Sequence, residues 1–141
     1  MEKTVDQIKQ EIIDELSLFE DWISKFEYII DLGKKMSMPE DLKKQEYMVE
    51  GCSSRAWIVP QYKDGKLYFE TDGDAVMAKG MMALVLRLVN GRTPDEILNT
   101  DFSFLEEIGL IQNLSPSRAG GLESMIEKIK EYAKQAKEGK L

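Results

Sequence analysis

Cys52 is the single cysteine of the chain and lies in the segment Gly51-Cys52-Ser53-Ser54. Its neighbours are small, and a glycine lets the backbone turn tightly and leaves room for another molecule to approach. A thiolate on such a loop can attack a sulfur atom of another protein. A lone cysteine is, however, most often a small buried hydrophobic residue. Residue types alone therefore leave two interpretations, a reactive loop thiol and an inert core thiol.

The composition excludes several other kinds of chemistry. The chain has no histidine, so Ser–His and Cys–His nucleophilic catalysis cannot occur within it. One cysteine cannot form an intramolecular disulfide, a Cys/His zinc site or a single-chain, cysteine-ligated iron–sulfur cluster. The net charge of −7, from 19 basic and 26 acidic residues, argues against binding to nucleic acid or to an anionic membrane.

The length of 141 residues and the hydrophobic content of 43% predict one globular domain over residues 1–141. No apolar run reaches the roughly 18 residues that a membrane helix needs. The N-terminal segment is acidic and has a helical pattern, without the apolar core of a signal peptide. We therefore expect a cytoplasmic protein.

The first third of the chain has a helical pattern. Thr4 and Gln7 have the spacing of a capping box, and apolar residues follow them at helical intervals. A second helix is expected from about Asp21 to Gly33. Residues 37–47 show no period and predict an exposed loop.

The next part of the chain predicts strands. Residues 56–59 and 66–71 are rich in β-branched and aromatic side chains, and Asp64-Gly65 between them is a hairpin-turn signal. Met48-Val49 is expected to begin a third strand. Pro60 places the first hairpin strand at an edge or a bulge. We expect an α+β fold in which helices pack on one face of a small antiparallel sheet of about three strands.

Helical patterns return after the hairpin. Asp74 is expected to be the N-cap of the first of these helices, and Gly80 within that helix is expected to permit close helix packing. Ser115-Pro116-Ser117 predicts the start of a long final helix. The helices expected in this half are at 75–89, at 94–99, around 103–108, and from about residue 116 to Lys137.

The segment Val49-x-Gly51-Cys52-x-Ser54-x-x-Trp57 resembles the active-cysteine segment of the SufE family, which includes CsdE-type acceptors. Three further segments resemble the family in order and at the expected spacing: Trp22 with Tyr28-Ile29-Ile30-Asp31-Leu32-Gly33; Asp72-x-Asp74-Ala75 with Lys79-Gly80; and Leu114-Ser115-Pro116-Ser117-Arg118 with Gly121-Leu122-Glu123-x-Met125-Ile126. The departures from the family pattern are Ser53, Gly73 and Ser115.

The resemblance implies a specific role for Cys52. In the family, this cysteine accepts sulfane sulfur from the persulfide of a PLP-dependent cysteine desulfurase, of the SufS or CsdA type, and the acceptor stimulates that enzyme. The sulfur then passes to a SufB-containing scaffold complex for iron–sulfur cluster assembly. The resemblance thus implies a SufE/IscU-like fold and a sulfur-transfer partner protein rather than an enzyme, with no cofactor or metal of its own. Whether the chain forms a homodimer is left open.

Four further residues are candidates for supporting roles. Gly51 and Ser54 shape the loop around Cys52. Arg118 is expected either to stabilise the thiolate, because a nearby cation lowers a thiol pKa, or to tie the last helix to an acid. Asp74 is a helix cap that is also a candidate contact for the desulfurase. Trp57 is expected to be a core residue behind the loop.

Three other functions are alternatives to sulfur carriage. A cluster scaffold of the IscU type normally needs several cysteine ligands, and this chain has one. A thiol-dependent redox enzyme would usually need a resolving thiol. A regulatory module that stimulates a desulfurase without carrying sulfur remains the alternative.

Overall fold

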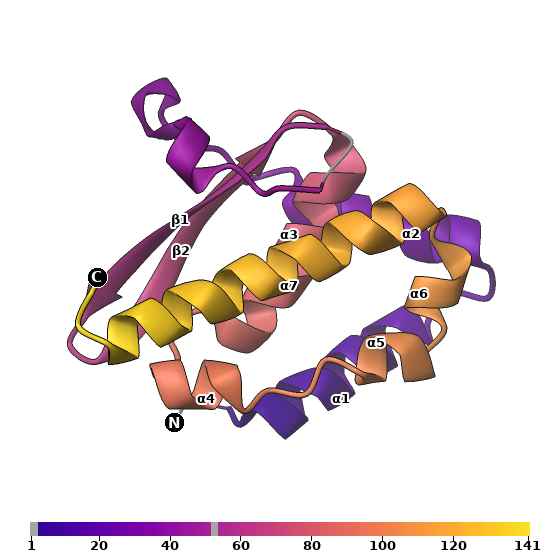
Figure 1. Ribbon diagram of the computed structural model, residues 1–141. Coiled ribbons are helices and arrows are strands. Elements are labelled where there is room, and N and C mark those ends of the chain that lie inside the picture. The colour runs from indigo at the N-terminus through magenta and orange to yellow at the C-terminus, as the bar shows by residue number, and fades with distance from the viewer. Residues whose placement is uncertain (1–2, 52–53) are drawn as a thin grey trace.

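A computed structural model describes residues 3–51 and 54–141, and Figure 1 shows the arrangement of their helices and strands. The elements are α1 (Val5–Leu16), α2 (Trp22–Gly33), the short 3-10 helices η1 (Glu40–Leu42) and η2 (Gln45–Tyr47), β1 (Ala56–Lys63), β2 (Lys66–Gly73), α3 (Val76–Val89), α4 (Pro94–Leu98), α5 (Phe104–Glu107), α6 (Leu110–Asn113) and α7 (Pro116–Lys137). The fold is α+β, as the sequence predicts.

The sheet is an antiparallel hairpin of β1 and β2, and not a sheet of about three strands. The hairpin turns at Asp64 and Gly65, whose φ angles of 53° and 78° suit a type I′ turn. Met48 makes only an isolated bridge to Trp57. A third strand does not develop there because η2 ends directly before Met48 and the chain turns at Gly51, where φ is +86°. Pro60 fits the sheet because both strands of a two-stranded sheet are edge strands.

The inner face of the hairpin packs on α3 and α7. Ile58, Leu67 and Phe69 are buried on this face. The Tyr132 hydroxyl of α7 donates a hydrogen bond to the Ile58 carbonyl oxygen at 2.8 Å. In Figure 1, α7 passes between the hairpin on one side and α1, α4 and α5 on the other. The long helix therefore contacts both the sheet and the helical layer.

The helices α2 and α3 meet backbone to backbone at two glycines. A Cβ atom placed on Gly80 would lie 2.4 Å from the Ile29 carbonyl oxygen, and one on Gly33 would lie 2.5 Å from the Gly80 nitrogen. No real Cβ atom fits at these distances without a shift of the backbone. The expectation that Gly80 permits close helix packing is confirmed.

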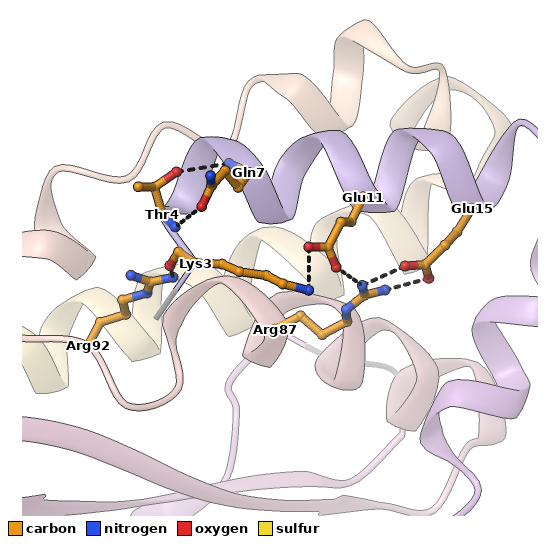
Figure 2. Close-up of polar contacts among 7 residues, drawn as sticks. All are labelled: Lys3, Thr4, Gln7, Glu11, Glu15, Arg87 and Arg92. Atoms are coloured by element: carbon orange, nitrogen blue, oxygen red, sulfur yellow. Dashed lines mark hydrogen bonds and ion pairs between the residues drawn. The ribbon is translucent and has the colours of Figure 1, made fainter. Parts of the chain in front are cut away.

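A polar network joins α1 to α3 (Figure 2). The Arg87 guanidinium donates to both carboxylate oxygens of Glu15, at 2.7 and 2.6 Å, and lies 3.7 Å from Glu11. Hydrogen bonding from Arg87 lowers the pKa of Glu15 below its ordinary value, although partial burial opposes the shift. At the start of α1, Thr4 and Gln7 form the expected capping box. The N-terminal helix is thus fixed by a two-armed ion pair as well as by buried Ile12 and Leu16.

Two details of the second half differ from the sequence prediction. The helix α3 begins at Val76 with Ala75 as its N-cap, and no side chain caps it, so Asp74 is not the N-cap. An additional short helix, α6, follows Gly109, whose φ of +88° separates it from α5. The long helix α7 begins and ends as expected, with Ser115 as its N-cap. Over the described part of the chain, no helix has both the length and the apolar character needed to cross a membrane.

Candidate functional site

The two ends of the loop that carries the cysteine are held side by side. The Val49 N–H donates to the Ala56 carbonyl oxygen at 2.8 Å, and Met48 forms its bridge to Trp57 just outside this pair. The hydrogen bond between Val49 and Ala56 therefore joins the two ends of the loop of residues 50–55 beside the hairpin. Cys52 and Ser53 lie outside the described residues, so the predicted role of Cys52 stays a prediction.

The backbone conformation of Gly51 favours glycine, and α7 lies close to this residue. Its φ of +86° lies in the left-handed region that favours glycine. A Cβ atom there would also lie 2.7 Å from the Ser124 hydroxyl oxygen of α7. The tight turn that the sequence predicts at this glycine is present, and α7 is the element of the described chain that lies against it. The approach of another molecule to this backbone stays a prediction.

A cavity of about 130 Å³ lies beside the loop and is lined by Ser54, Ala75, Met77, Ala78, Met81, Ser117, Arg118, Gly121 and Met125. Three of these side chains are methionines, which are flexible and carry polarisable sulfur atoms. Ser54 is half-buried at the point where the described chain resumes after the loop. The cavity is mostly apolar, with a cation and two hydroxyl groups, and it suits a small soft group better than a hydrated ion.

Arg118 lies in the first turn of α7 and shares the cavity with Ser54. Its backbone N–H donates to the Ser115 hydroxyl, which caps the helix, at 3.3 Å. Among the ion pairs formed between described residues, none includes Arg118. Arg118 therefore lies on the Ser54 side of the loop. Within the described residues, it forms no ion pair with an acid that would fix the start of α7.

Asp74 closes the base of the loop instead of capping a helix. Its carboxylate accepts a hydrogen bond from Arg55 Nε at 2.7 Å, and its N–H donates to the Arg55 carbonyl oxygen at 2.9 Å. Both side chains are exposed. Asp74 does not line the cavity, although its neighbour Ala75 does.

Arg55 is the residue that the sequence analysis missed. The signal for it was present, because pairing outward from the Asp64-Gly65 turn joins Ala56 to Gly73 and so sets Arg55 opposite Asp74. The Arg55 guanidinium carbon also lies 5.3 Å from the centre of the Trp57 ring, a cation–π distance. Arg55 thus links the loop to both strands.

Trp57 is a core residue, as expected, with 2% of its surface exposed. Lys43 Nζ lies 5.4 Å from its ring centre, so two cations, Lys43 and Arg55, contact the ring. The buried indole N–H has no acceptor among the described residues. Trp57 therefore connects the cysteine loop to residues 38–43, the segment that covers the outer face of the sheet.

Asp72 anchors that covering segment from the strand position opposite Trp57. Its carboxylate accepts hydrogen bonds from the Gly73 and Met38 N–H groups at 2.8 and 3.3 Å, and Lys43 Nζ lies 3.4 Å away. Burial raises the pKa of Asp72, but these backbone donors and Lys43 together lower the pKa below its ordinary value. Asp72 is therefore a buried anion that fixes residues 38–43 to the strand.

These features define a small α+β protein in which Gly51 and Ser54, the described residues on either side of Cys52 and Ser53, lie against the long helix and at a methionine-lined cavity, respectively. The sequence profile of the SufE family, described as an Fe-S metabolism associated domain, matches residues 10–133. The chain belongs to the SufE family.

Two relatives agree with this assignment, and a solved structure shares the fold. A protein named uncharacterized SufE-like protein from Rhizobium meliloti is 38% identical over 129 residues, which cover 87% of this chain and 92% of the relative. One with the same kind of name from Rhizobium etli is 36% identical over 130 residues, with 88% of each chain covered. The solution structure of a hypothetical protein from Thermus thermophilus has a TM-score of 0.74 at 17% identity, over 92% of this chain and 95% of that one, and so shares the fold.

Proposed function

We propose that this protein is a persulfide carrier that accepts sulfur on Cys52 from a PLP-dependent cysteine desulfurase of the SufS or CsdA type, stimulates that enzyme, and delivers the sulfur to a SufB-containing scaffold. The observation that carries the proposal is the family match across a loop that holds the chain's only cysteine. Association with Fe-S metabolism follows from the family. In this proposal the protein is a transfer partner and not an enzyme, and it acts in the cytoplasm.

The transfer is an exchange at sulfur. The Cys52 thiolate attacks the terminal sulfur of the desulfurase persulfide, the S–S bond of that persulfide breaks, and the desulfurase cysteine leaves as a thiolate. Cys52 then carries the persulfide, and no electrons are gained or lost overall. The second transfer repeats this step, with a thiolate of the scaffold as the attacking group. Each step requires an anionic sulfur on the attacking cysteine.

Arg118 is the cation that we assign to the Cys52 thiolate. It lines the cavity that Ser54 also lines, and it has no ion pair among the described residues. Arg55, by contrast, is already paired with Asp74. A cation beside a thiol lowers its pKa and raises the thiolate fraction near neutral pH. Gly51 and Ser54 serve the transfer by shaping the loop, and Asp74 serves it through Arg55 as a candidate contact for the desulfurase.

The direct test is transfer of labelled sulfur. The protein is incubated with a SufS-type desulfurase, PLP and ³⁵S-cysteine, then separated without reductant. We expect label on the wild-type chain that dithiothreitol removes, a mass increase of about 32 Da on the Cys52 peptide, and no label on Cys52→Ser. Label retained by Cys52→Ser at the wild-type level would refute carriage. Stimulation of the desulfurase by Cys52→Ser equal to that by the wild type would favour the regulatory alternative.

The role of Arg118 is tested by the rate of Cys52 alkylation as a function of pH. We expect Arg118→Gln to shift the alkylation midpoint to higher pH and Arg118→Lys to restore it in part. Arg55→Gln is the matched control, since it removes a cation that is already neutralised by Asp74. An unchanged midpoint in Arg118→Gln, or an equal shift in both glutamine variants, would remove Arg118 from the site.

A further inference from the structure

A second concave surface lies on the other flank of α7. This groove, of about 490 Å³, runs between α7 and the segment that contains α5 and α6. Its floor is apolar and consists of Phe102, Leu105, Ile111, Leu122 and Ile126. Leu105 and Leu122 are fully buried, while the other three are half-buried. In Figure 1, α5 and α6 lie on the side of α7 that faces away from the hairpin.

The rim of the groove is acidic on both sides. Glu106 lines it from α5, and Glu123 and Glu127 line it from α7. None of the three glutamates is in an ion pair with another described residue. Lys130, the cation of the lining, lies instead over the Phe102 ring, 5.4 Å from its centre. The lining therefore presents three carboxylates, none of them in an ion pair with another described residue, and one cation.

The spacing of these carboxylates opposes the stability of α7. Glu123 and Glu127 are one helical turn apart on the same face, and like charges at this spacing destabilise a helix. A cation placed between them would relieve that repulsion. An apolar floor beside carboxylates that form no ion pair with the described residues suits a partner that is apolar on one face and positively charged at its edges.

We propose that this groove binds an amphipathic, basic helix of a partner protein. The apolar face of that helix would lie on the floor, and its Lys or Arg side chains would pair with Glu106 on one side and with Glu123 and Glu127 on the other. This is the helix-in-groove mode of recognition, with charge complementarity at the rim.

Charge excludes the other classes of occupant. Phosphate groups of nucleic acids or anionic lipids would meet three carboxylates. A second copy of this chain, docked through the same surface on both partners, would bring two acidic rims together, because a two-fold interface uses the same patch twice. The occupant must therefore carry positive charge in excess of the one cation, Lys130, that the lining contains.

The groove and the cysteine loop can be occupied independently. Gly121 and Met125 of α7 line the cavity beside the loop, whereas Leu122 and Ile126, each one residue later, line the groove. One residue corresponds to a rotation of about 100° around a helix. The groove is thus a separate surface, and its occupation does not depend on sulfur transfer at Cys52.

The test uses the full chain labelled with ¹⁵N and a model helical peptide of alternating leucine and lysine blocks, with a matched peptide in which glutamate replaces every lysine. We expect the lysine peptide to shift amide resonances of residues 102–111 and 119–130, and the affinity to fall with salt. The glutamate peptide should cause no such shifts. Equal binding of both peptides, or shifts that lie elsewhere, would overturn the proposal.

Two charge reversals on α7 provide the matched comparison. Glu127→Lys should weaken binding of the lysine peptide at least fivefold, whereas Glu131→Lys, an exposed position outside the groove one turn further along, should change it less than twofold. Circular dichroism checks that both variants fold. Equal affinities of the two variants would overturn the proposal, and so would resonance shifts at the groove caused by vesicles of anionic phosphatidylglycerol. Both variants should load labelled sulfur on Cys52 at the wild-type level, so failure here is distinguishable from failure of the carrier proposal.

Discussion

Replacing Gly80 by alanine should destabilise the protein by driving α2 and α3 apart. The new Cβ atom would lie 2.4 Å from the Ile29 carbonyl oxygen and 2.8 Å from the carbonyl carbon. Both are backbone atoms within α2, so no change of side-chain rotamer relieves the contact. The two helices must separate, and the packing of the buried residues around the crossing, including Ile29, is loosened with them.

The size of the effect follows from two opposing terms. Overpacking of a close-packed interior costs about 3 kcal/mol when backbone must move. Alanine in place of glycine inside a helix contributes about 1 kcal/mol of stability. The expected net loss is therefore about 2 kcal/mol, which corresponds to a fall of roughly 6–8 °C in Tm for a chain of this size.

Gly120 provides a control, because the same substitution by alanine is expected to have the opposite effect on stability. It lies within α7, and a Cβ atom there would meet no atom within 4 Å. Gly120→Ala should therefore raise stability by about 0.5–1 kcal/mol. Gly33→Ala should resemble Gly80→Ala, and the two should not be additive because they act at one crossing.

Urea denaturation followed by circular dichroism measures all four proteins, the wild type and the three alanine variants. The reasoning is refuted if Gly80→Ala is as stable as the wild type, or if Gly120→Ala loses as much stability as Gly80→Ala. The first result would mean that the helices separate at no cost. The second would mean that the glycine effect does not arise from contact between the helices.

Three further predictions concern buried or paired side chains. Trp57→Ala should cost about 3–5 kcal/mol of stability in the same denaturation assay, and a loss below 1 kcal/mol would contradict its place in the core. Glu15→Gln should cost about 1–2 kcal/mol at pH 7 because it weakens the two-armed pair with Arg87. The pKa of Glu15 is lowered in the folded state, so its contribution to stability is present above the ordinary value of 4.5 and is lost as pH falls below it. The difference in Tm between Glu15→Gln and the wild type should therefore shrink in acid. A constant difference from pH 7 to pH 3 would refute the assignment. Asp72→Asn should speed hydrogen exchange at the Met38 amide, and unchanged protection there would show that Asp72 does not anchor the covering segment.

Local patterns were sufficient to predict most of the helices and the hairpin. The capping box at Thr4, the turn at Asp64-Gly65 and the proline after Ser115 each act through neighbouring residues, so their outcome could be predicted from the sequence. The third strand at Met48 could not be judged in this way, because its extent depends on the 3-10 helix before it and the turn after it.

The features of the candidate site that depend on local backbone conformation could be predicted. Those that depend on contacts between residues far apart in the sequence could not. Glycine at position 51 permits the left-handed conformation that the chain adopts there. Asp74 has a good local capping sequence, yet the hairpin register sets it opposite Arg55, and that distant pairing determines its role. Met77 and Met81 have helical spacing, but nothing in the spacing shows that they meet Met125 around one cavity.

The hairpin register also limits where the gene can be altered. Residues 64–65 form an exposed tip of the kind that usually tolerates added sequence. A slip of one residue in the pairing, however, turns every side chain of a strand to the opposite face. Leu67 and Phe69 would then leave the interior, and Arg55 would lose its place opposite Asp74. Affinity tags or fluorescent fusions should therefore be attached beyond Gly139, where the chain is exposed and a Cβ atom meets no neighbour, and not inserted at the hairpin tip.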